Sequence, residues 1–209
     1  MFLARELIEL AKENGADLVK FQLYDSKKLY GKKHKEELGF DDARWLFESG
    51  KSLGIEVFFS VFDTERVKWC EEIGVKRYKI AYSQRNNDIL ISTIPKDKFV
   101  IVSTPYDGAS SELFCAYYTT YLYCVPKYPT QLSDITFTTP DSDYIWDIVD
   151  GFSDHTNGLD ASKIALACGA QIIEKHFAID HHTGVDAEWS MTPDELKELK
   201  RWEQICEQL

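Results

Sequence analysis

The apolar positions of this chain follow two spacings that alternate along its length. Apolar runs of roughly four to eight residues bounded by turn residues predict buried strands, and apolar residues three and four positions apart predict amphipathic helices. The predicted strands cover residues 17–22, 56–60, 77–82, 99–104, 120–125, 150–153 and 171–177. The predicted helices cover residues 1–14, 41–52, 64–73, 88–94, 110–117, 142–149, 161–168 and 193–208.

The residues between these segments carry helix-start and loop signals. Asp41 is expected to cap the helix that it begins, and Thr192 followed by Pro193 is typical of a helix N-terminus. Residues 24–39 are polar and rich in lysine, which predicts a mobile loop, and residues 126–140 are predicted to form a proline-rich loop.

Strands that alternate with helices are typical of a parallel sheet covered by helices. An eight-unit barrel takes about 250 residues, the chain has 209, and its first helix has no strand before it. We therefore predict an α/β fold in which residues 1–209 form a single (β/α)8 TIM-type barrel domain that lacks its first strand. A doubly wound open sheet is the alternative, but it usually carries a glycine-rich phosphate loop after an early strand. This chain has Phe21-Gln22-Leu23-Tyr24 there.

A barrel without its first strand leaves two sheet edges, here residues 17–22 and 171–177. An exposed edge presents unpaired backbone groups that another chain can bind. We therefore expect the gap to be covered by a partner chain, by a homodimer contact or by the N-terminal helix.

Composition and charge narrow the class of protein. The hydrophobic content of 44% predicts a globular chain, and the net charge of −11 argues against nucleic acid or an anionic membrane as a partner. The five cysteines are widely spaced without a CxxC pair, which predicts reduced, buried thiols. Because no apolar run is long enough to span a membrane and no signal peptide precedes the first helix, we expect a cytoplasmic protein.

Two histidines follow consecutive predicted strands. His155 and His176 stand at the carboxyl ends of these strands, where α/β barrels place their chemistry. Neighbouring parallel strands lie about 4.8 Å apart, so both imidazoles can reach one ion. Ser153 shares a strand face with His155, and Glu174 shares one with His176. Either histidine alone is more often a hydrogen-bonded core residue, but the pair favours a metal site.

Two lysines fall at inward strand positions. An ammonium group buried without a counter-charge is costly, so Lys20 and Lys79 are expected to face an anionic ligand. The alternative for Lys79 is an internal salt bridge, for example to Glu174.

Several motifs together resemble the sialic acid synthase family, which includes N-acetylneuraminate, legionaminate, pseudaminate and spore-coat polysaccharide synthases. They are VKFQ at 19–22, GVKRYKIA at 74–81, VSTP at 102–105, KYPT at 127–130, FSDHT at 152–156, EKHF at 174–177 and WSMTPDEL at 189–196. The resemblance implies a (β/α)8 barrel that condenses phosphoenolpyruvate with an N-acetylated amino sugar such as N-acetylmannosamine and releases phosphate. It also implies a divalent metal, Mn²⁺ first and Mg²⁺ as the alternative, and a homodimer in which a small C-terminal antifreeze-like domain reaches the partner's site.

The resemblance also implies roles for individual residues. His155 and His176 match the metal ligands, and Lys20 and Lys79 match lysines that hold phosphoenolpyruvate. Hydroxyl groups that bind phosphate or carboxylate are matched by Ser60, Ser103 and Ser153. Positions that touch the sugar are matched by Gln22, Tyr128 and Asp186. We expect Glu174 and Lys79 to take part in catalysis. Glu174 is expected to transfer a proton, because it lies two residues before His176 and so shares its strand face.

The chain also departs from the family pattern. The family's first strand, with its glutamate and Asn-His-Asn-Gly stretch, and the C-terminal domain have no counterpart in these residues. Tyr82 and Pro126 stand where a serine and an asparagine are usual. Each lost hydrogen bond to a charged group is worth about 1.5–3 kcal/mol, so phosphoenolpyruvate is expected to bind more weakly. Two alternatives therefore stay open, a non-catalytic metal- and anion-binding remnant or subunit of a split synthase, and another phosphoenolpyruvate-dependent 3-deoxy sugar acid synthase.

Overall fold

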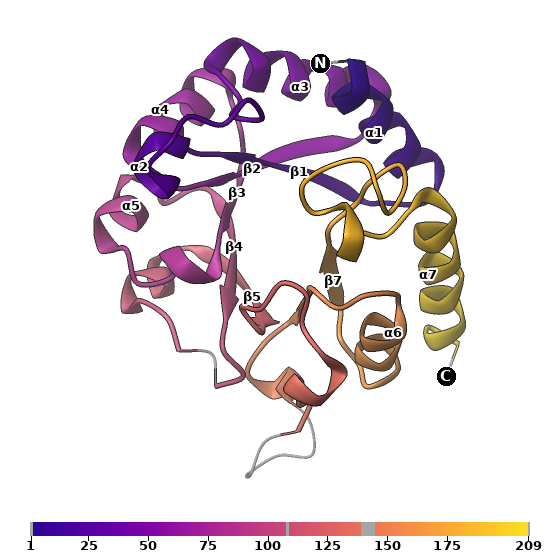
Figure 1. Ribbon diagram of the computed structural model, residues 1–209. Helices are drawn as coiled ribbons and strands as arrows, with labels where there is room; N and C mark the ends of the chain where they lie inside the picture. The colour runs from indigo at the N-terminus through magenta and orange to yellow at the C-terminus, as the bar shows by residue number, and fades with distance from the viewer. Residues whose placement is uncertain (1, 108, 139–144, 209) are drawn as a thin grey trace. The chain divides into compact units, whose positions relative to one another are not determined.

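The structure, a computed structural model, describes residues 2–107, 109–138 and 145–208 (Figure 1). Their contacts divide them into two compact units. The first unit contains Met1–Ile8, Asp17–Val102 and Ser110–Thr120, and the second contains Glu9–Ala16, Ser103–Ala109 and Tyr121–Leu209. The single domain over residues 1–209 stays a prediction.

The first unit is a parallel sheet with helices in the connections between its strands (Figure 1). Its strands are hydrogen-bonded in the order of the chain and are β1 (Leu18–Leu23), β2 (Glu56–Val61), β3 (Arg77–Ile80) and β4 (Phe99–Thr104). Its helices are α2 (Ser26–Tyr30), α3 (Phe40–Leu53), α4 (Thr64–Ile73) and α5 (Asp88–Thr93), with 3₁₀ turns η1 (Tyr82–Gln84) and η2 (Glu112–Ala116). Helices α3 and α4 pack against β2.

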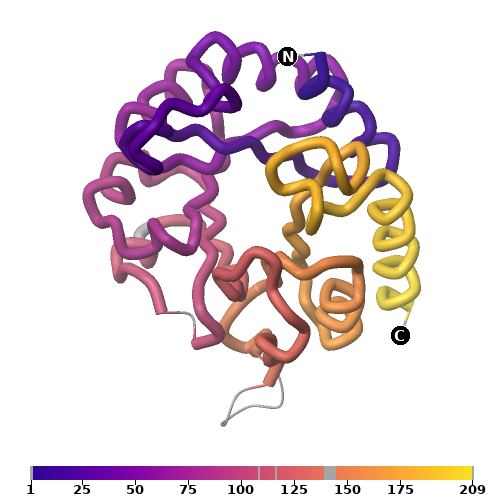
Figure 2. Tube along the Cα trace, in the orientation of Figure 1, coloured from indigo at the N-terminus to yellow at the C-terminus, as the bar shows by residue number. Residues whose placement is uncertain are grey.

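The second unit repeats the same arrangement, and the chain can be followed through it in Figure 2. Its parallel strands are β5 (Tyr118–Cys124), which begins in the first unit, β6 (Gly151–Asp154) and β7 (Ile172–Lys175). Its helices are α6 (Asp160–Ala167) and α7 (Pro193–Cys206), with 3₁₀ turns η3 (Leu132–Asp134), η4 (Ile145–Asp147) and η5 (Ala187–Trp189). Helix α1 (Phe2–Glu13) has residues in both units, and α6 packs against β6, β7 and α7.

The core of the second unit shows why β6 begins with glycine. A cluster of buried apolar side chains that includes Tyr123 and Phe152 packs between the strands and α6. A Cβ atom at Gly151 would lie 2.1 Å from the carbonyl oxygen of Ile172, a distance that heavy atoms do not tolerate. The close approach of β6 to β7 therefore requires a residue without a side chain at this position.

The structure confirms the α/β class and the parallel strands, and every predicted strand is present with small shifts at its ends. The barrel that lacks its first strand is a finer prediction, to which we return below. Helix α4 and strand β4 have the predicted bounds, and Thr192 caps α7 with Pro193 in its first turn.

Several local predictions were wrong. Of residues 24–39, predicted to form a loop, residues 26–30 form helix α2, which is capped by the Asp25 side chain, whereas residues 31–39 are loop as predicted. Gly39, rather than Asp41, is the N-cap of α3, since the carboxylate of Asp42 accepts from the Gly39 N–H at 2.9 Å. Residues 110–117 form a 3₁₀ turn at Glu112–Ala116 in place of an α-helix.

Two further predictions are corrected in part. Residues 142–144 of the predicted helix 142–149 lie outside the described residues, and the described remainder forms only the turn η4. Cys70 and Cys124 are buried as predicted, whereas Cys115 is exposed because its turn lies at the surface. In the described part of the chain no helix has the length and apolar character needed to cross a bilayer.

Candidate functional site

The second unit brings the two histidines of the sequence motifs together. His155 follows β6 and His176 follows β7, and their ring centroids lie 5.4 Å apart. The Nδ1 atom of His155 lies 3.3 Å from the carbonyl oxygen of Val125. The Nδ1 atom of His176 lies 3.4 Å from the Oδ2 atom of Asp186. An Nδ1–H that donates to such an oxygen leaves the lone pair of the imidazole on Nε2, the usual arrangement of a histidine that binds a metal.

Tyr128 joins this group from the loop after β5, next to the cis peptide bond that it forms with Pro129. Its ring centroid lies 4.3 Å from that of His155 and 6.2 Å from that of His176. Trp189, in η5, adds a second aromatic wall at 6.1 Å from the Tyr128 ring. Sequence reasoning missed Trp189, although it lies in the same WSMTPDEL motif that supported the resemblance.

Ser153 and Glu174, each two residues before one of the histidines, form a hydrogen-bonded pair. They are register partners on β6 and β7, and the Ser153 hydroxyl lies 2.7 Å from the Glu174 carboxylate. Cys124 is the register partner of Ser153 on β5, and its sulfur lies 3.8 Å from the Nδ1 atom of His155. Ser153 and Glu174 therefore lie on the same face of the sheet, and the faces that they were predicted to share with His155 and His176 stay a prediction.

The opposite faces of these strands carry an ion pair that sequence reasoning missed. The Lys175 ammonium lies 3.0 Å from the Asp154 carboxylate, with both side chains at most 1% exposed. The carboxylate also accepts from the backbone N–H and the hydroxyl of Thr156, at 2.7 and 2.8 Å, and from the Ser162 hydroxyl at 2.5 Å. Asp154 lies inside the SDHT motif and Lys175 inside the EKHF motif. Their opposite charges at the ends of two neighbouring predicted strands are the sequence signal that could have indicated the pair.

The first unit holds four more of the predicted residues on adjacent strands, and Ser103 belongs to the second unit. Gln22, Ser60 and Lys79 occupy successive register positions on β1, β2 and β3. Lys79 is 2% exposed, and its ammonium group donates to the carbonyl oxygen of Ile80 at 3.0 Å. Lys20 precedes Gln22 by two residues and so shares its strand face. Ser103, near the end of β4, is buried.

Metal binding by protein side chains alone is not supported in the described part of the chain, where no group of three or more His, Cys, Asp or Glu side chains could hold an ion. A metal–imidazole bond is about 2 Å long, so two rings at the observed separation can turn one nitrogen each toward the same ion. Such an ion would complete its coordination with water or with oxygen atoms of a substrate. His181 and His182, in the next loop, are exposed as expected.

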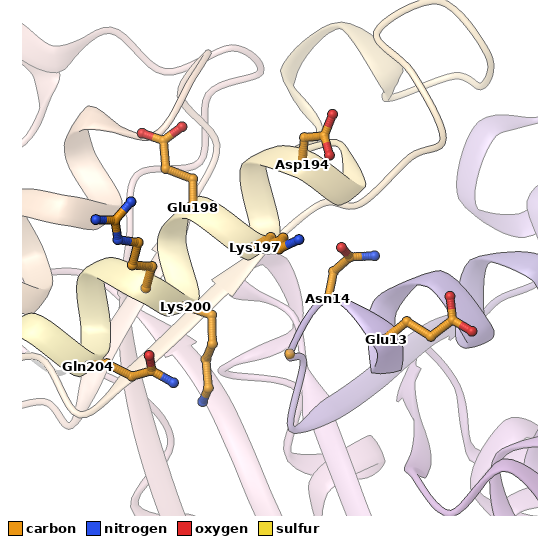
Figure 3. Close-up of a pocket in the computed structure, with 9 residues that line it drawn as sticks. Glu13, Asn14, Asp194, Lys197, Glu198, Lys200 and Gln204 are labelled. Carbon is orange, nitrogen blue, oxygen red and sulfur yellow. The ribbon is translucent and has the colours of Figure 1, made fainter.

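A separate cavity of about 530 Å³ lies between the end of α1 and one face of α7 (Figure 3). Both acidic and basic side chains line it, among them Glu13, Lys197, Glu198 and Lys200 (Figure 3). None of the predicted site residues is among those that line this cavity in the described structure. Its mixed charge gives no preference for one class of ligand.

Comparison with known proteins identifies relatives over almost the whole chain. A model of the NeuB family matches residues 34–209. N,N'-diacetyllegionaminic acid synthase of Legionella pneumophila is 31% identical over 240 residues, which cover 94% of this chain and 65% of the relative. Human N-acetylneuraminate-9-phosphate synthase is 30% identical over 241 residues, which cover 98% of this chain and 66% of the relative. The chain thus spans about two thirds of the length of these curated relatives.

Solved structures agree with this relationship. The crystal structure of N-acetylneuraminic acid synthetase from Leptospira borgpetersenii, in complex with citrate, matches with a TM-score of 0.85 at 29% identity and covers 99% of this chain and 79% of that one. A truncated 3-deoxy-D-arabino-heptulosonate 7-phosphate synthase from Thermotoga maritima matches with a TM-score of 0.71 at 14% identity, over 99% of this chain and 82% of that one. The second likeness shows a shared fold alone.

Proposed function

Because this chain belongs to the NeuB family, we propose that it condenses phosphoenolpyruvate with an N-acetylated amino-sugar aldehyde to give a nonulosonic acid and phosphate. The reaction joins C3 of phosphoenolpyruvate to the aldehyde carbon and consumes a water molecule. The observation that carries the proposal is the pair His155 and His176, with rings 5.4 Å apart and each Nδ1 atom near an oxygen acceptor. We also propose that the seven strands correspond to the second to eighth strands of a (β/α)8 barrel.

The two imidazoles fit a divalent metal, and we propose Mn²⁺, with Mg²⁺ as the alternative. His155 and His176 would hold it through Nε2, while Val125 and Asp186 fix the ring orientations from Nδ1. A divalent cation supplies Lewis-acid polarisation of the sugar aldehyde when it is bound. Asp186, exposed enough to reach a ligand, and Tyr128 are proposed to contact the sugar.

The lysines of the first unit are proposed to bind phosphoenolpyruvate. Lys79 is almost wholly buried, and a charge in such surroundings attracts an anion more strongly than one in water. Ser60 is its register partner and can add a hydroxyl donor, and Gln22 follows on the next strand. Lys20 completes the proposed anion contacts of the first unit, and Ser103, in the second unit, is proposed separately to bind phosphate or carboxylate.

Glu174 is the proposed proton-transfer residue. Its carboxylate lies 2.7 Å from the Ser153 hydroxyl, which orients the carboxylate and can pass a proton to it. Glu174 lies two residues before His176, so strand parity puts both side chains on one face. In this proposal the Glu174 carboxylate therefore lies near the reacting aldehyde and can transfer a proton.

The proposed function is tested first by calorimetric titration of Mn²⁺ into metal-free protein, with and without phosphoenolpyruvate. We expect binding in the micromolar range that tightens with phosphoenolpyruvate and is lost in a His155→Ala/His176→Ala variant. The matched control is His181→Ala/His182→Ala, which removes two exposed imidazoles from the neighbouring loop. Absence of Mn²⁺ binding in the wild type, or equal loss in both double variants, would exclude the metal site.

Turnover is measured in parallel as phosphate released from phosphoenolpyruvate in the presence of N-acetylmannosamine. Tyr82, where the family has a serine, favours the alternative of a binding protein without turnover, because its ring packs against Arg85 at 4.1 Å and offers no aliphatic hydroxyl. Mn²⁺ and phosphoenolpyruvate binding without phosphate release would support that alternative. Phosphate release with an unacetylated sugar phosphate in place of N-acetylmannosamine would support the other 3-deoxy sugar acid synthase.

A partner at the sheet edges is proposed as well. β1 and β7 stand at the two ends of the strand order, and an uncovered strand edge pairs readily with another chain. We propose a homodimer or a partner chain that covers this edge. Light scattering coupled to size exclusion tests it, and a monomer at all concentrations, with no partner required for solubility, would argue against it.

A further inference from the structure

Trp189 carries a polar group that is buried and has no partner among the described residues. Its indole N–H is sealed from solvent, and no acceptor lies within hydrogen-bonding distance of it in the described part of the chain. A buried donor without an acceptor is costly, and proteins usually keep one where a ligand or water supplies the acceptor.

The position of Trp189 connects this donor to the proposed sugar site. The Trp189 ring lies 6.1 Å from the Tyr128 ring, which in turn lies 4.3 Å from His155. The turn that carries Trp189 is tied to Asp186, because the Trp189 N–H and the Ser190 hydroxyl both donate to the Asp186 carbonyl, at 3.3 and 2.7 Å. The Asp186 carboxylate lies 3.4 Å from His176. The indole thus packs near Tyr128, the aromatic residue that lies next to both histidines, and its turn is hydrogen-bonded to the residue that contacts His176.

Two other tryptophans serve as comparisons. Trp202 donates its indole N–H to the Lys163 carbonyl at 2.9 Å. Trp146 also has a buried N–H without an acceptor among the described residues, but its ring packs against Phe137 at 5.5 Å beside the apolar cluster of the second unit. Trp189 combines a donor without an acceptor among the described residues with a ring next to Tyr128, and Trp146 provides a matched control.

An acetamido group has the chemistry that suits the aromatic surface formed by Trp189 and Tyr128. It offers a carbonyl oxygen, which accepts an N–H, and a methyl group, which packs on an aromatic ring. We propose that Trp189 is a specificity residue that binds the acetamido group of the amino sugar, with the indole N–H donating to the acetamido carbonyl and the rings of Trp189 and Tyr128 enclosing the methyl. This inference rests on the proposed function and names the part of the substrate that this wall selects.

The test compares N-acetylmannosamine with mannose, which has a hydroxyl in place of the acetamido group. Trp189→Phe keeps an aromatic ring and removes the N–H. We expect it to raise the KM for N-acetylmannosamine about three- to tenfold while the KM values for mannose and phosphoenolpyruvate stay within about twofold. Trp189→Ala should raise the KM for N-acetylmannosamine further, and Trp146→Phe should change none of these values. An equal change for both sugars, or no change, overturns the inference.

A binding measurement separates this inference from the proposed reaction. Saturation-transfer NMR with N-acetylmannosamine should show transfer to the acetyl methyl in the wild type and in Trp146→Phe, and a marked loss in Trp189→Ala. This NMR outcome in a protein without turnover would reject the proposed condensation and support the acetamido contact. Turnover with an acetyl methyl signal that is unchanged in Trp189→Ala would support the reaction and reject the acetamido contact. Absence of an acetyl methyl signal in the wild type would also reject the acetamido contact.

Discussion

Asp154 and Lys175 form an ion pair of 3.0 Å whose two side chains are at most 1% exposed, one residue before each of the two histidines. The Lys175 ammonium also donates to the Thr156 carbonyl at 2.7 Å, and the Asp154 carboxylate accepts from Thr156 and Ser162. The pair therefore joins the ends of β6 and β7 to the start of α6. Because a strand alternates its faces, the same anchoring holds His155 and His176 on the opposite side.

Removal of one partner of this pair should destabilise the protein strongly. Lys175→Met leaves a buried carboxylate without its counter-charge, which costs about 3–5 kcal/mol. We expect a lower midpoint of urea unfolding, and Asp154→Leu/Lys175→Met should be more stable than Lys175→Met. Lys51→Met is the control, because it breaks an exposed pair with Glu48 that contributes about 1 kcal/mol or less. Equal effects of the two lysine substitutions would contradict this account.

Glu174 is predicted to act in the chemical step. Glu174→Gln removes the proton-accepting carboxylate, so kcat should fall by about a hundredfold or more while Mn²⁺ affinity is retained. Ser153→Ala removes the hydroxyl at 2.7 Å that orients the carboxylate and should lower kcat less. Glu188→Gln, in the exposed part of η5, is the matched control. Full turnover by Glu174→Gln would exclude this role.

Glu37 should make stability depend on pH in the acid range. Hydrogen bonds from Lys33 and Ser26 lower the pKa of the Glu37 carboxyl to about 2 from an ordinary 4.5. A carboxyl whose pKa is lower in the folded state stabilises above its unfolded pKa, and this stabilisation is lost as the pH falls from 4.5 towards 2.

The measurement is the urea midpoint of wild type and Glu37→Gln at pH 7 and pH 3. The gap between the two proteins should narrow at the lower pH, because the glutamine has no proton to bind. Glu36→Gln, at the neighbouring position in a more exposed pair with Lys35, should leave the pH dependence as in the wild type. A constant gap between wild type and Glu37→Gln would show that Glu37 has the same pKa folded and unfolded.

Gly151 should not tolerate a side chain. A Cβ atom 2.1 Å from the Ile172 carbonyl oxygen would push β6 away from β7, and overpacking of this kind costs about 1–3 kcal/mol or more. Gly151→Ala should therefore lower the urea midpoint and weaken Mn²⁺ binding, since His155 and His176 follow these two strands. Gly39→Ala is the control, because the nearest atom to its added Cβ is 3.5 Å away. A Gly151→Ala protein with wild-type stability and Mn²⁺ affinity would contradict the prediction.

The sequence predicted the strands and the parallel sheet because the spacing of apolar residues is a local property. Strand parity also placed Ser153 and Glu174 on inward faces, and the structure joins them by a hydrogen bond. The cap of α3 was not predicted, because Asp41 has a suitable residue type, whereas in the structure Gly39 is the N-cap and its N–H donates to the Asp42 carboxylate.

The segment 24–39 shows contacts that local reasoning did not provide. Its lysines predicted a mobile loop, yet Lys33 lies 2.6 Å from Glu37, and Glu37 accepts from the buried Ser26 at 2.5 Å. Arg66, from α4, lies 3.6 Å from the same carboxylate. The sequence of a polar segment does not indicate whether its charged side chains are solvated or form ion pairs with one another.

The sequence by itself determined the order of strands and helices, the family resemblance and the two histidines, because these follow from periodicity and from motifs read along the chain. The tertiary structure alone decided which polar groups meet. It paired Asp154 with Lys175, set Asp186 beside His176 and placed Trp189 next to Tyr128. Such contacts join residues far apart in the chain, and their energies depend on burial and distance, which only the packed strands and loops define.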